Sequence, residues 1–453
     1  MLFRLTIAMV LLGAFAMSTF AAETRKPNVI VFLSDDVGYG EYGFQGNTEI
    51  PTPHIDSIAK NGVRFTQGYV SGPYCSPTRA GLLTGRYQTR FGHEFNEGGA
   101  TGTNRGFGLP LEEKTMADRL KALGYATCAV GKWHLGGGPK HLPMARGFDE
   151  FYGTVANTPF LNPPNFIDSR KSNEISPVKD DNFYTTDAYA ERAVDWIGKN
   201  KDKSFFLYLP FNAQHAPLQA PKKYLDRFAK IEDGKRRIFA AMMSAMDDAV
   251  GAVLAKVKEI GQEENTLIFF FSDNGGPTPV TTSKNGSLRG FKATTLEGGV
   301  RVPFCAQWKG KIPAGKTFDH PIIQLDILPT ALVAAGEKID PAWKLDGVDL
   351  MPFLTGKADG KPHESLFWRF GEQWAVRHGD WKLVASRIDG TTPRLFNLKD
   401  DIGESKDLTA TEPAKAKELK AIYDKWNAEQ KDPLWIPAKK KNPKKNPKKD
   451  GID

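Results

Sequence analysis

The sequence contains only three cysteines among its 453 residues, at positions 75, 128 and 305. A fold held together by many disulfide bonds is therefore excluded. The sequence also shows no internal repeat. A hydrophobic content of 40% and an aromatic content of 11% are ordinary for a globular protein, which excludes wholesale disorder. A chain of this length can bury a large core without disulfides, and the length predicts about two or three domains.

The main body of the chain has little net charge, although the whole sequence carries a formal charge of +8. Residues 438–453 contribute five of these charges, because seven lysines there outweigh two aspartates, and Arg4 contributes one. A nucleic-acid-binding function therefore loses its main support, and we expect no nucleic-acid partner. The Lys/Pro-rich segment 438–453 is predicted to be a disordered tail. It is either simply solvated or able to bind a sulfated or otherwise anionic polymer.

Long apolar runs are also scarce, since only the N-terminus has one. Arg4 precedes an apolar run from Leu5 to Met17, and small residues follow it. The run is shorter than the ~20 residues that span a bilayer. This pattern is typical of a secretory signal peptide over residues 1–21, with an uncleaved membrane anchor as the alternative. We therefore expect a mature protein that is exported to the periplasm or the extracellular space, without stable membrane insertion.

Apolar segments rich in β-branched and aromatic residues alternate with helical patterns through residues 22–345. The segments that predict buried strands are Pro27–Leu33, Tyr125–Val130, Ser204–Leu209 and Thr266–Phe271. Helices are predicted over Thr115–Leu123 and Arg237–Ile260, each followed by a glycine. This alternation predicts an α/β domain with a large, mostly parallel sheet flanked by helices.

The pattern changes after residue 345. Short strands are predicted at Leu366–Ala375, Trp381–Ser386 and Arg394–Asn397, and an amphipathic helix at Glu412–Gln430. Residues 346–437 are therefore expected to form a smaller C-terminal subdomain, an antiparallel sheet with one helix.

Two pairs of oxygen-bearing side chains follow predicted buried strands. Asp35 and Asp36 come directly after the first strand, and Asp273 and Asn274 follow the strand at Thr266–Phe271. The carboxyl ends of parallel strands line the ligand crevice of such a sheet. Hard oxygen ligands suit Ca²⁺ or Mg²⁺ better than zinc. The alternative is that these residues only cap helices and form turns.

Cys75 begins the sequence Cys75-Ser76-Pro77-Thr78-Arg79, and Leu-Leu-Thr-Gly-Arg follows at residues 82–86. Taken alone, a single cysteine is usually buried or half of a disulfide. The Cys-x-Pro-x-Arg pattern, however, resembles the signature of the type I sulfatases of the alkaline phosphatase-like superfamily. Gly-Lys-Trp-His at residues 131–134 and Ser-Asp-Asn-Gly at residues 272–275 extend this resemblance. It covers roughly residues 26–430.

The resemblance implies that a maturation enzyme oxidises Cys75 to Cα-formylglycine during export. It also implies one divalent cation per chain, Ca²⁺ rather than Mg²⁺, whose ligands are Asp35, Asp36, Asp273, Asn274 and the modified Cys75. A hydrated aldehyde carries two hydroxyl groups on one carbon. One attacks sulfur, and loss of the proton from the other then expels the sulfate and regenerates the aldehyde. A metal and nearby cations offset the charge that makes sulfate esters resist attack.

The resemblance assigns roles to five further residues. Arg79 steadies the modified residue, Lys132 bridges nucleophile and sulfate, and Lys292 binds sulfate oxygens. His134 is the base of the elimination step, and His215 protonates the leaving alcohol. Taken singly, these histidines and lysines could equally be structural or solvated residues. Many relatives have a sulfate-contacting serine near the position of Asn157, so that contact stays open.

The leaving alcohol is not fixed by the sulfate-handling motifs. A secretion signal favours a sulfated carbohydrate, of polysaccharide or glycosaminoglycan type, as substrate. Candidate sugar contacts, which could equally be core or rim residues, are His93, Glu94, Asn104, Arg105, Trp368, Arg369 and Trp374. The alternatives are a phosphodiester or phosphonate hydrolase of the same superfamily, or a non-catalytic protein that binds sulfated glycans. Whether Cys128 and Cys305 form a disulfide also stays open.

Overall fold

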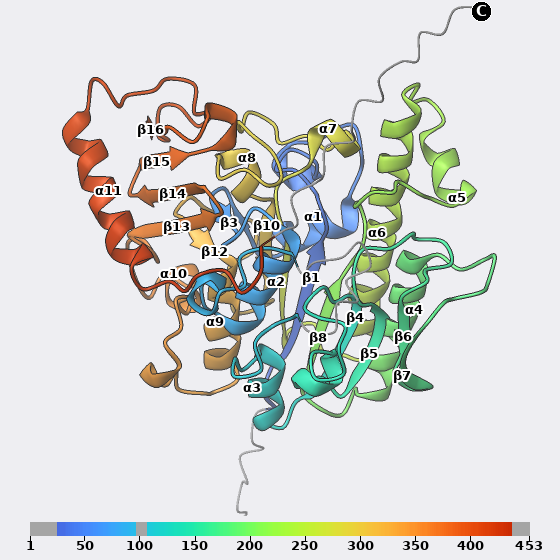
Figure 1. Ribbon diagram of the computed structural model, residues 1–453. Coiled ribbons are helices and arrows are strands. Elements are labelled where there is room, and N and C mark those ends of the chain that lie inside the picture. Colours follow the sequence, from blue (N-terminus) through green and yellow to red (C-terminus); the bar gives the residue numbers. More distant parts are fainter. Residues whose placement is uncertain (1–24, 97–106, 437–453) are drawn as a thin grey trace, which may run out of the picture.

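The computed structural model describes residues 25–96 and 107–436 and shows an α/β fold around one large sheet (Figure 1). The predicted signal peptide, the Lys/Pro-rich tail, and Asn104 and Arg105 lie outside these residues. The sheet has ten strands in the order β11-β2-β10-β9-β1-β8-β4-β5-β6-β7. Its strands are β1 (Asn28–Ser34), β2 (Val63–Phe65), β4 (Ala126–Lys132), β5 (Glu150–Thr154), β6 (Phe166–Asp168), β7 (Ser172–Ser176), β8 (Phe205–Pro210), β9 (Thr266–Ser272), β10 (Phe304–Gln307) and β11 (Lys316–Phe318).

The central strands are parallel, as the apolar runs predict. Strand β1 pairs in parallel with β8 on one side and β9 on the other, and β4 pairs in parallel with β8 and β5. All seven residues of β1 are buried, because helices cover both faces of the sheet. The bounds of β1, β8 and β9 differ from the prediction by one residue at one or both ends, and β4 starts at Ala126 and continues through Lys132 instead of ending near Gly131.

Helices form a layer on each face of the sheet (Figure 1). One layer, which packs on residues such as Ile30 and Phe270, contains α1 (Pro53–Lys60), α4 (Thr185–Lys199) and α6 (Gly234–Glu259). The other contains α2 (Cys75–Thr84), α3 (Met116–Ala122) and α9 (Ile327–Ala334). Helix α6 is long and apolar enough to cross a membrane, but 67% of its most apolar window is buried inside the fold, as in a core helix. Short helices are α5 (Lys222–Leu225), α7 (Thr278–Thr281), α8 (Glu297–Val300) and α10 (Met351–Leu354), and β3 (Gly68–Tyr69) pairs with β12 (Ile322–Ile323).

A second, four-stranded antiparallel sheet forms the C-terminal part of the fold, as expected. It consists of β13 (Ser365–Phe370), β14 (Gln373–His378), β15 (Trp381–Ala385) and β16 (Pro393–Asn397), and α11 (Pro413–Asn427) packs against it. The prediction of one strand over Leu366–Ala375 was wrong. The chain reverses at Gly371, whose φ of +63° favours glycine, and Phe370 pairs with Gln373 across the turn.

The two cysteines outside the sulfatase-like motif do not form a disulfide. Cys128 lies in β4 and Cys305 in β10, with β9, β1 and β8 between these strands. Neighbouring strands are about 4.8 Å apart, so the two residues are several times farther apart than a disulfide permits. Both thiols are free and buried.

Candidate active site

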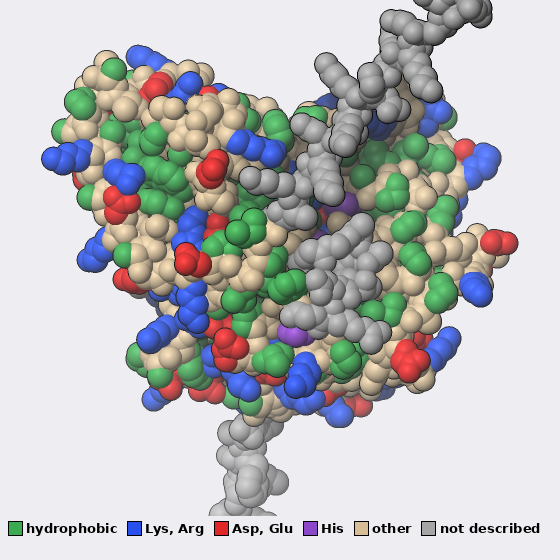
Figure 2. Space-filling view, viewed as in Figure 1, with side chains coloured by type: hydrophobic (Ala, Val, Ile, Leu, Met, Phe, Trp, Pro, Cys, Tyr) green, Lys and Arg blue, Asp and Glu red, His purple; other side chains and the backbone are tan. Residues whose placement is uncertain are grey.

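The candidate site lies at the carboxyl ends of β1 and β9, where the two acidic pairs meet. The strands are in register, with Ser34 opposite Ser272, so the residues that follow each strand emerge at the same level. The backbone N–H of Asp36 donates to Asp273 Oδ1 at 3.2 Å. The amide of Asn274 donates to Asp36 Oδ1 at 2.8 Å. Figure 2 shows this side of the molecule hollowed between the C-terminal sheet and α6, with a histidine side chain visible in the hollow.

Cys75 stands at the first position of α2 and is completely buried. Its Sγ lies 3.5 Å from Asp35 Oδ1 and 3.2 Å from Lys292 Nζ. The N-terminal end of a helix favours negative charge on nearby groups. The only cysteine of the motif therefore lies between a carboxylate of the strand end and an ammonium group.

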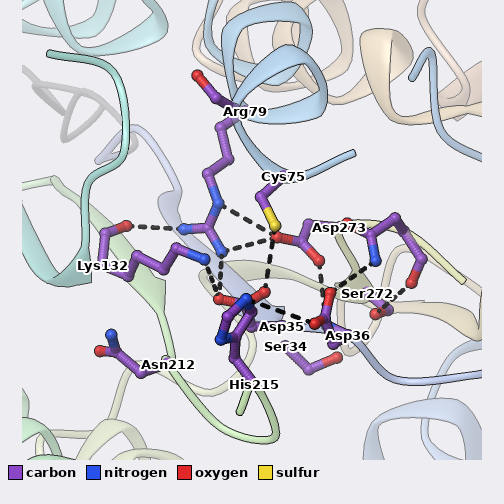
Figure 3. Close-up of polar contacts among 12 residues, drawn as sticks. Ser34, Asp35, Asp36, Cys75, Arg79, Lys132, Asn212, His215, Ser272 and Asp273 are labelled. Atoms are coloured by element: carbon purple, nitrogen blue, oxygen red, sulfur yellow. Dashed lines mark hydrogen bonds and ion pairs between the residues drawn. The ribbon is translucent and has the colours of Figure 1, made fainter. Parts of the chain in front are cut away.

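Arg79 follows Cys75 by one helical turn, so both side chains project from the same face of α2. Its guanidinium donates to Asp273 Oδ2 from Nη2 at 2.9 Å and to the carbonyl oxygen of Lys132 from Nη1 at 2.7 Å (Figure 3). Asp35 Oδ2 is 3.5 Å from Nη2. Arg79 thus ties α2 to three strand ends.

The end of β4 contributes Lys132 and His134. Lys132 Nζ forms a close ion pair with Asp35 Oδ2, and both side chains are fully buried. His134 has a φ of +57°, and its backbone N–H donates to the carbonyl oxygen of Val155 at 2.9 Å. Burial lowers the pKa of His134 well below its usual value, and the charge of Lys132 lowers it further. Its Nδ1 is buried and has no hydrogen-bond partner among the described residues.

His215 and Lys292 both face Asp36. His215 Nε2 is 3.6 Å from Asp36 Oδ2 (Figure 3), and Lys292 Nζ is 2.5 Å from Asp36 Oδ1. Burial lowers the pKa of His215, although Asp36 opposes this shift. Burial would also lower the pKa of Lys292, but Asp36 and Cys75 hold it well above its usual value, so this lysine is charged. The structure therefore brings together all the residues to which the sequence motifs assign a role.

Charges of opposite sign are balanced in this buried site. Three carboxylates, those of Asp35, Asp36 and Asp273, face the cations of Arg79, Lys132 and Lys292. Burial alone would raise the pKa values of Asp35 and Asp36, but the neighbouring cations lower both. These two carboxylates are therefore ionised.

The donor set fits a hard divalent cation. Asn274 is fully buried, and its Oδ1 has no hydrogen-bond partner among the described residues. A buried amide oxygen without a partner is costly unless a cation or water binds it. Ligand atoms of Asp35, Asp36, Cys75 and His215 all lie within 4.8 Å of one another. Carboxylate and amide oxygens in such a cluster match Ca²⁺ or Mg²⁺.

Sequence reasoning missed the contacts that hold the His215 loop. The backbone of Asp35 exchanges two hydrogen bonds with this loop: its N–H donates to Ala213 O at 2.9 Å, and its carbonyl accepts from Gln214 N–H at 2.8 Å. Asn212 Oδ1 accepts from the hydroxyl of Tyr189 at 2.7 Å. Nothing in the sequence Asn212-Ala213-Gln214-His215 predicts these hydrogen bonds, because their partners lie in elements that are distant in sequence.

The protein resembles known proteins over nearly its whole length. The family model described as Sulfatase matches residues 27–337. Human arylsulfatase A is 35% identical over 449 residues, covering 87% of this chain and 85% of that protein. The chain belongs to the sulfatase family. It is thus a sulfuric ester hydrolase of the alkaline phosphatase-like superfamily.

Other relatives of this sulfatase are also similar over most of their length. N-acetylgalactosamine-6-sulfatase of Canis lupus familiaris is 30% identical over 433 residues, covering 85% of this chain and 82% of that protein. The crystal structure of Ps i-CgsB in complex with k-i-k-neocarrahexaose has a TM-score of 0.83 and 34% identity, covering 92% of this chain and 96% of that one. These likenesses agree with the fold that the strand pattern predicts.

Most of the predicted sugar contacts in this sulfatase are structural. Trp368 is fully buried and donates its indole N–H to the carbonyl oxygen of Val70, so of the two alternatives left open for it, the core residue applies. Glu94 accepts from Arg369 Nε at 2.8 Å. His93 is fully buried against Ser76, with 2.6 Å between its Nε2 and the serine Oγ. Trp374 stacks on Tyr423 of α11.

Proposed function

We propose that this sulfatase removes sulfate from a sulfated carbohydrate, of polysaccharide or glycosaminoglycan type. The nucleophile is a Cα-formylglycine made from Cys75, and one divalent cation, Ca²⁺ in preference to Mg²⁺, serves as cofactor. The observation that carries this proposal is the position of Cys75 Sγ, 3.5 Å from Asp35 Oδ1 and 3.2 Å from Lys292 Nζ.

The unmodified thiol is poorly suited to attack sulfur. Burial raises the pKa of Cys75, and the neighbouring carboxylate of Asp273 raises it further, although Lys132 and Lys292 oppose this. A protonated thiol is a weak nucleophile. Formylglycine instead supplies two hydroxyl groups on one carbon, one for attack on sulfur and one for release of the sulfate. This contrast supports conversion of Cys75 by a formylglycine-generating maturation enzyme, which is the protein partner that we propose.

The charges of the site favour an anionic substrate once a divalent cation is bound. Asp35, Asp36, Asp273 and Asn274 would hold that cation, which supplies positive charge opposite the sulfate oxygens. With all three carboxylates ionised, the three buried cations balance them, so a bound divalent cation would leave a surplus of two positive charges. A sulfate monoester and an ionised nucleophile together bring two negative charges. Lys132 and Lys292, beside Cys75, are then the side chains that orient the sulfate.

Two histidines are available for the proton transfers. His134 has a strongly lowered pKa and a buried, unpartnered Nδ1 among the described residues, so it is neutral and can accept a proton. His215 is the proposed donor to the leaving alcohol oxygen. Its lowered pKa is a property of the protein without substrate. A bound sulfate anion would raise that pKa, since a nearby negative charge favours the protonated imidazole.

The carbohydrate class rests on the similar proteins. Ps i-CgsB was crystallised with k-i-k-neocarrahexaose, and the Canis protein is named for N-acetylgalactosamine 6-sulfate. The predicted signal peptide agrees with an exported enzyme that meets such polymers outside the cell. A purely glycan-binding protein is disfavoured, because no proposed metal or acid–base residue is missing. Cys75 in a complete maturation signal argues against the Ser- or Thr-dependent phosphoesterases.

Intact-mass analysis of the exported protein tests the nucleophile. Conversion of Cys75 to formylglycine removes ~18 Da. Cys75→Ala should abolish sulfate release without loss of folding, whereas Cys128→Ala, a control at a buried thiol outside the site, should retain activity. Material with full conversion that releases no sulfate from carrageenan or glycosaminoglycan fragments would contradict the carbohydrate proposal. Full activity of Cys75→Ala would contradict the proposed nucleophile.

A further inference from the structure

We infer that Tyr74, Phe370 and Phe95 form a binding surface for a pyranose ring of the substrate, close to the reacting sulfate. We call these three residues the aromatic wall. This inference rests on the proposed function, because it assigns a substrate contact to the same site. The motifs do not include any of the three residues, and none of the three is among the predicted sugar contacts.

The aromatic wall joins three segments that are far apart in sequence. Tyr74 precedes α2, Phe95 follows the short helix at Gln88–Phe91, and Phe370 ends β13 of the C-terminal sheet. The Tyr74 and Phe370 ring centroids are 5.4 Å apart, and those of Phe95 and Phe370 are 5.1 Å apart. Tyr74 and Phe370 are half-buried, whereas Phe95, which packs against Phe370, is 9% exposed. Two rings therefore keep exposed surface, and the third supports Phe370.

The wall lies directly beside the reacting group. Lys292 Nζ is 3.2 Å from Cys75 Sγ and 5.1 Å from the centroid of the Tyr74 ring. The nucleophile and the Tyr74 ring therefore flank the same ammonium group. A sulfate bound by Lys292 has its ester oxygen only one bond from the substrate carbon. The Tyr74 ring is therefore within reach of the sugar that carries the sulfate or of the sugar next to it.

Polar contacts fix the tip of the hairpin that carries Phe370. Glu94 is 2% exposed, and its Oε1 accepts from the backbone N–H of Gly371 at 2.6 Å. Its Oε2 accepts from Arg369 Nε at 2.8 Å. The residues on both sides of Phe370 are thus bound to one buried carboxylate. A ring held in this way loses little conformational freedom when a ligand binds, which favours affinity.

The chemistry of the wall matches a saccharide better than a bare anion. Aromatic rings pack against apolar surface, and the C–H face of a pyranose provides such surface. The wall itself has no positive charge, so it adds nothing to sulfate binding beyond Lys292. It should therefore contribute to the affinity for the sugar and leave the affinity for inorganic sulfate unchanged.

The test compares two ligands of the mature enzyme that require no turnover. One is inorganic sulfate, measured as a competitive inhibitor, and the other is the desulfated oligosaccharide product of the best wild-type substrate, measured by calorimetry. We expect Phe370→Ala to weaken saccharide binding by about tenfold and to leave the inhibition constant of sulfate unchanged. Phe370→Trp should restore saccharide binding. Glu372→Ala, at the exposed turn of the same hairpin, is the matched control and should behave as wild type.

The outcomes distinguish a failure of the aromatic-wall assignment from a failure of the proposed function. If Phe370→Ala binds the saccharide as tightly as the active wild type does, the assignment of the aromatic wall as a sugar-binding surface is wrong. An equal loss for both ligands would also overturn it, because it would indicate a distorted sulfate site. A wild-type enzyme that releases sulfate only from esters without a sugar would overturn the proposed substrate class instead. Tyr74→Phe, checked by mass for full conversion at Cys75, measures how much the tyrosine hydroxyl contributes to the affinity for the saccharide.

Discussion

Arg79 donates two hydrogen bonds to a single oxygen of Asp273, from Nε at 3.3 Å and from Nη2 at 2.9 Å. Both side chains have zero exposure. This pair connects the helix that begins with Cys75 to the strand end that carries two proposed metal ligands. Loss of this ion pair should therefore affect the position of the proposed nucleophile, the binding of the proposed cation and the stability of the fold.

Asp273→Asn should destabilise the protein and weaken cation binding. The substitution keeps the shape of the side chain but leaves the buried guanidinium without its closest counter-charge, which costs about 3 kcal/mol. Calorimetric unfolding with and without added CaCl₂ measures both effects. Asp226→Asn, which breaks the exposed ion pair with Lys222, should change stability by less than about 1 kcal/mol. A variant as stable and as responsive to calcium as wild type would refute the role of the pair.

Removal of the cation should abolish turnover and lower the melting temperature. Without it, Asn274 Oδ1 is a buried acceptor that lacks a partner among the described residues. Dialysis against EGTA, followed by titration with CaCl₂ or MgCl₂, should restore both properties, with calcium effective at the lower concentration. Asn274→Leu removes the amide oxygen and should raise the calcium concentration required. Full activity after complete chelation would contradict the metal assignment.

Gln373 should act as a positioning residue for Lys292. Its Nε2 donates to the carbonyl oxygen of Ala293 at 3.0 Å, and its Oε1 accepts from the N–H of Arg387 at 3.1 Å. Gln373→Glu keeps the shape and the acceptor but loses the donor to Ala293. We expect about tenfold weaker competitive inhibition by inorganic sulfate, from the loss of one buried hydrogen bond. Gln373→Asn, which retains an amide, should recover part of the lost affinity for inorganic sulfate. Unaltered inhibition by sulfate in the Glu variant would exclude this role.

The contribution of Glu404 to stability should fall as the pH rises from about 4.5 to about 7. Burial raises the pKa of this carboxyl group from 4.5 to about 7, and the neighbouring carboxylate of Glu297 adds to this shift, although Lys382, which pairs with both carboxylates, opposes it. The folded state therefore binds a proton that the unfolded state has lost, so unfolding becomes easier with rising pH in that window.

The Glu404→Gln variant tests this dependence. The amide keeps the acceptor for the backbone N–H of Glu297, which lies 2.7 Å from Glu404 Oε2. We expect the melting temperatures of variant and wild type to agree near pH 4.5 and to separate at pH 8, with the variant higher. Glu372→Gln, at an exposed site, should follow the wild type throughout. A constant difference between Glu404→Gln and wild type at all pH values would refute the raised pKa.

The sequence predicted the central sheet and the grouping of the candidate site residues at one edge of it for a common physical reason. Buried parallel strands need unbroken apolar runs such as Thr266–Phe271, and their polar residues are confined to the ends. Polar pairs such as Asp35 and Asp36 after such a run therefore mark the crevice. The motif around Cys75 supplied the chemistry, because its residue types are adjacent in sequence.

The rest could not be predicted, because it depends on contacts between distant segments. Trp368 and Phe370 both belong to one alternating strand, and nothing in that alternation distinguishes the buried indole from the ring at the hairpin tip. Glu94 and Arg369 have the residue types of a sugar-binding site, yet they bind each other across 275 residues of chain. The hydrogen bonds of Arg369 and Gly371 to Glu94 help to hold Phe370 beside Tyr74.

The complete burial of Cys75 bears on when the proposed conversion can take place. A modifying enzyme must bring its own catalytic groups to the sulfur, and in the folded protein α2 and the surrounding strand ends leave no surface of that residue accessible. We therefore expect the proposed conversion to precede folding. A chain that folds before it is converted would retain its thiol, because the native core protects the residue from later repair.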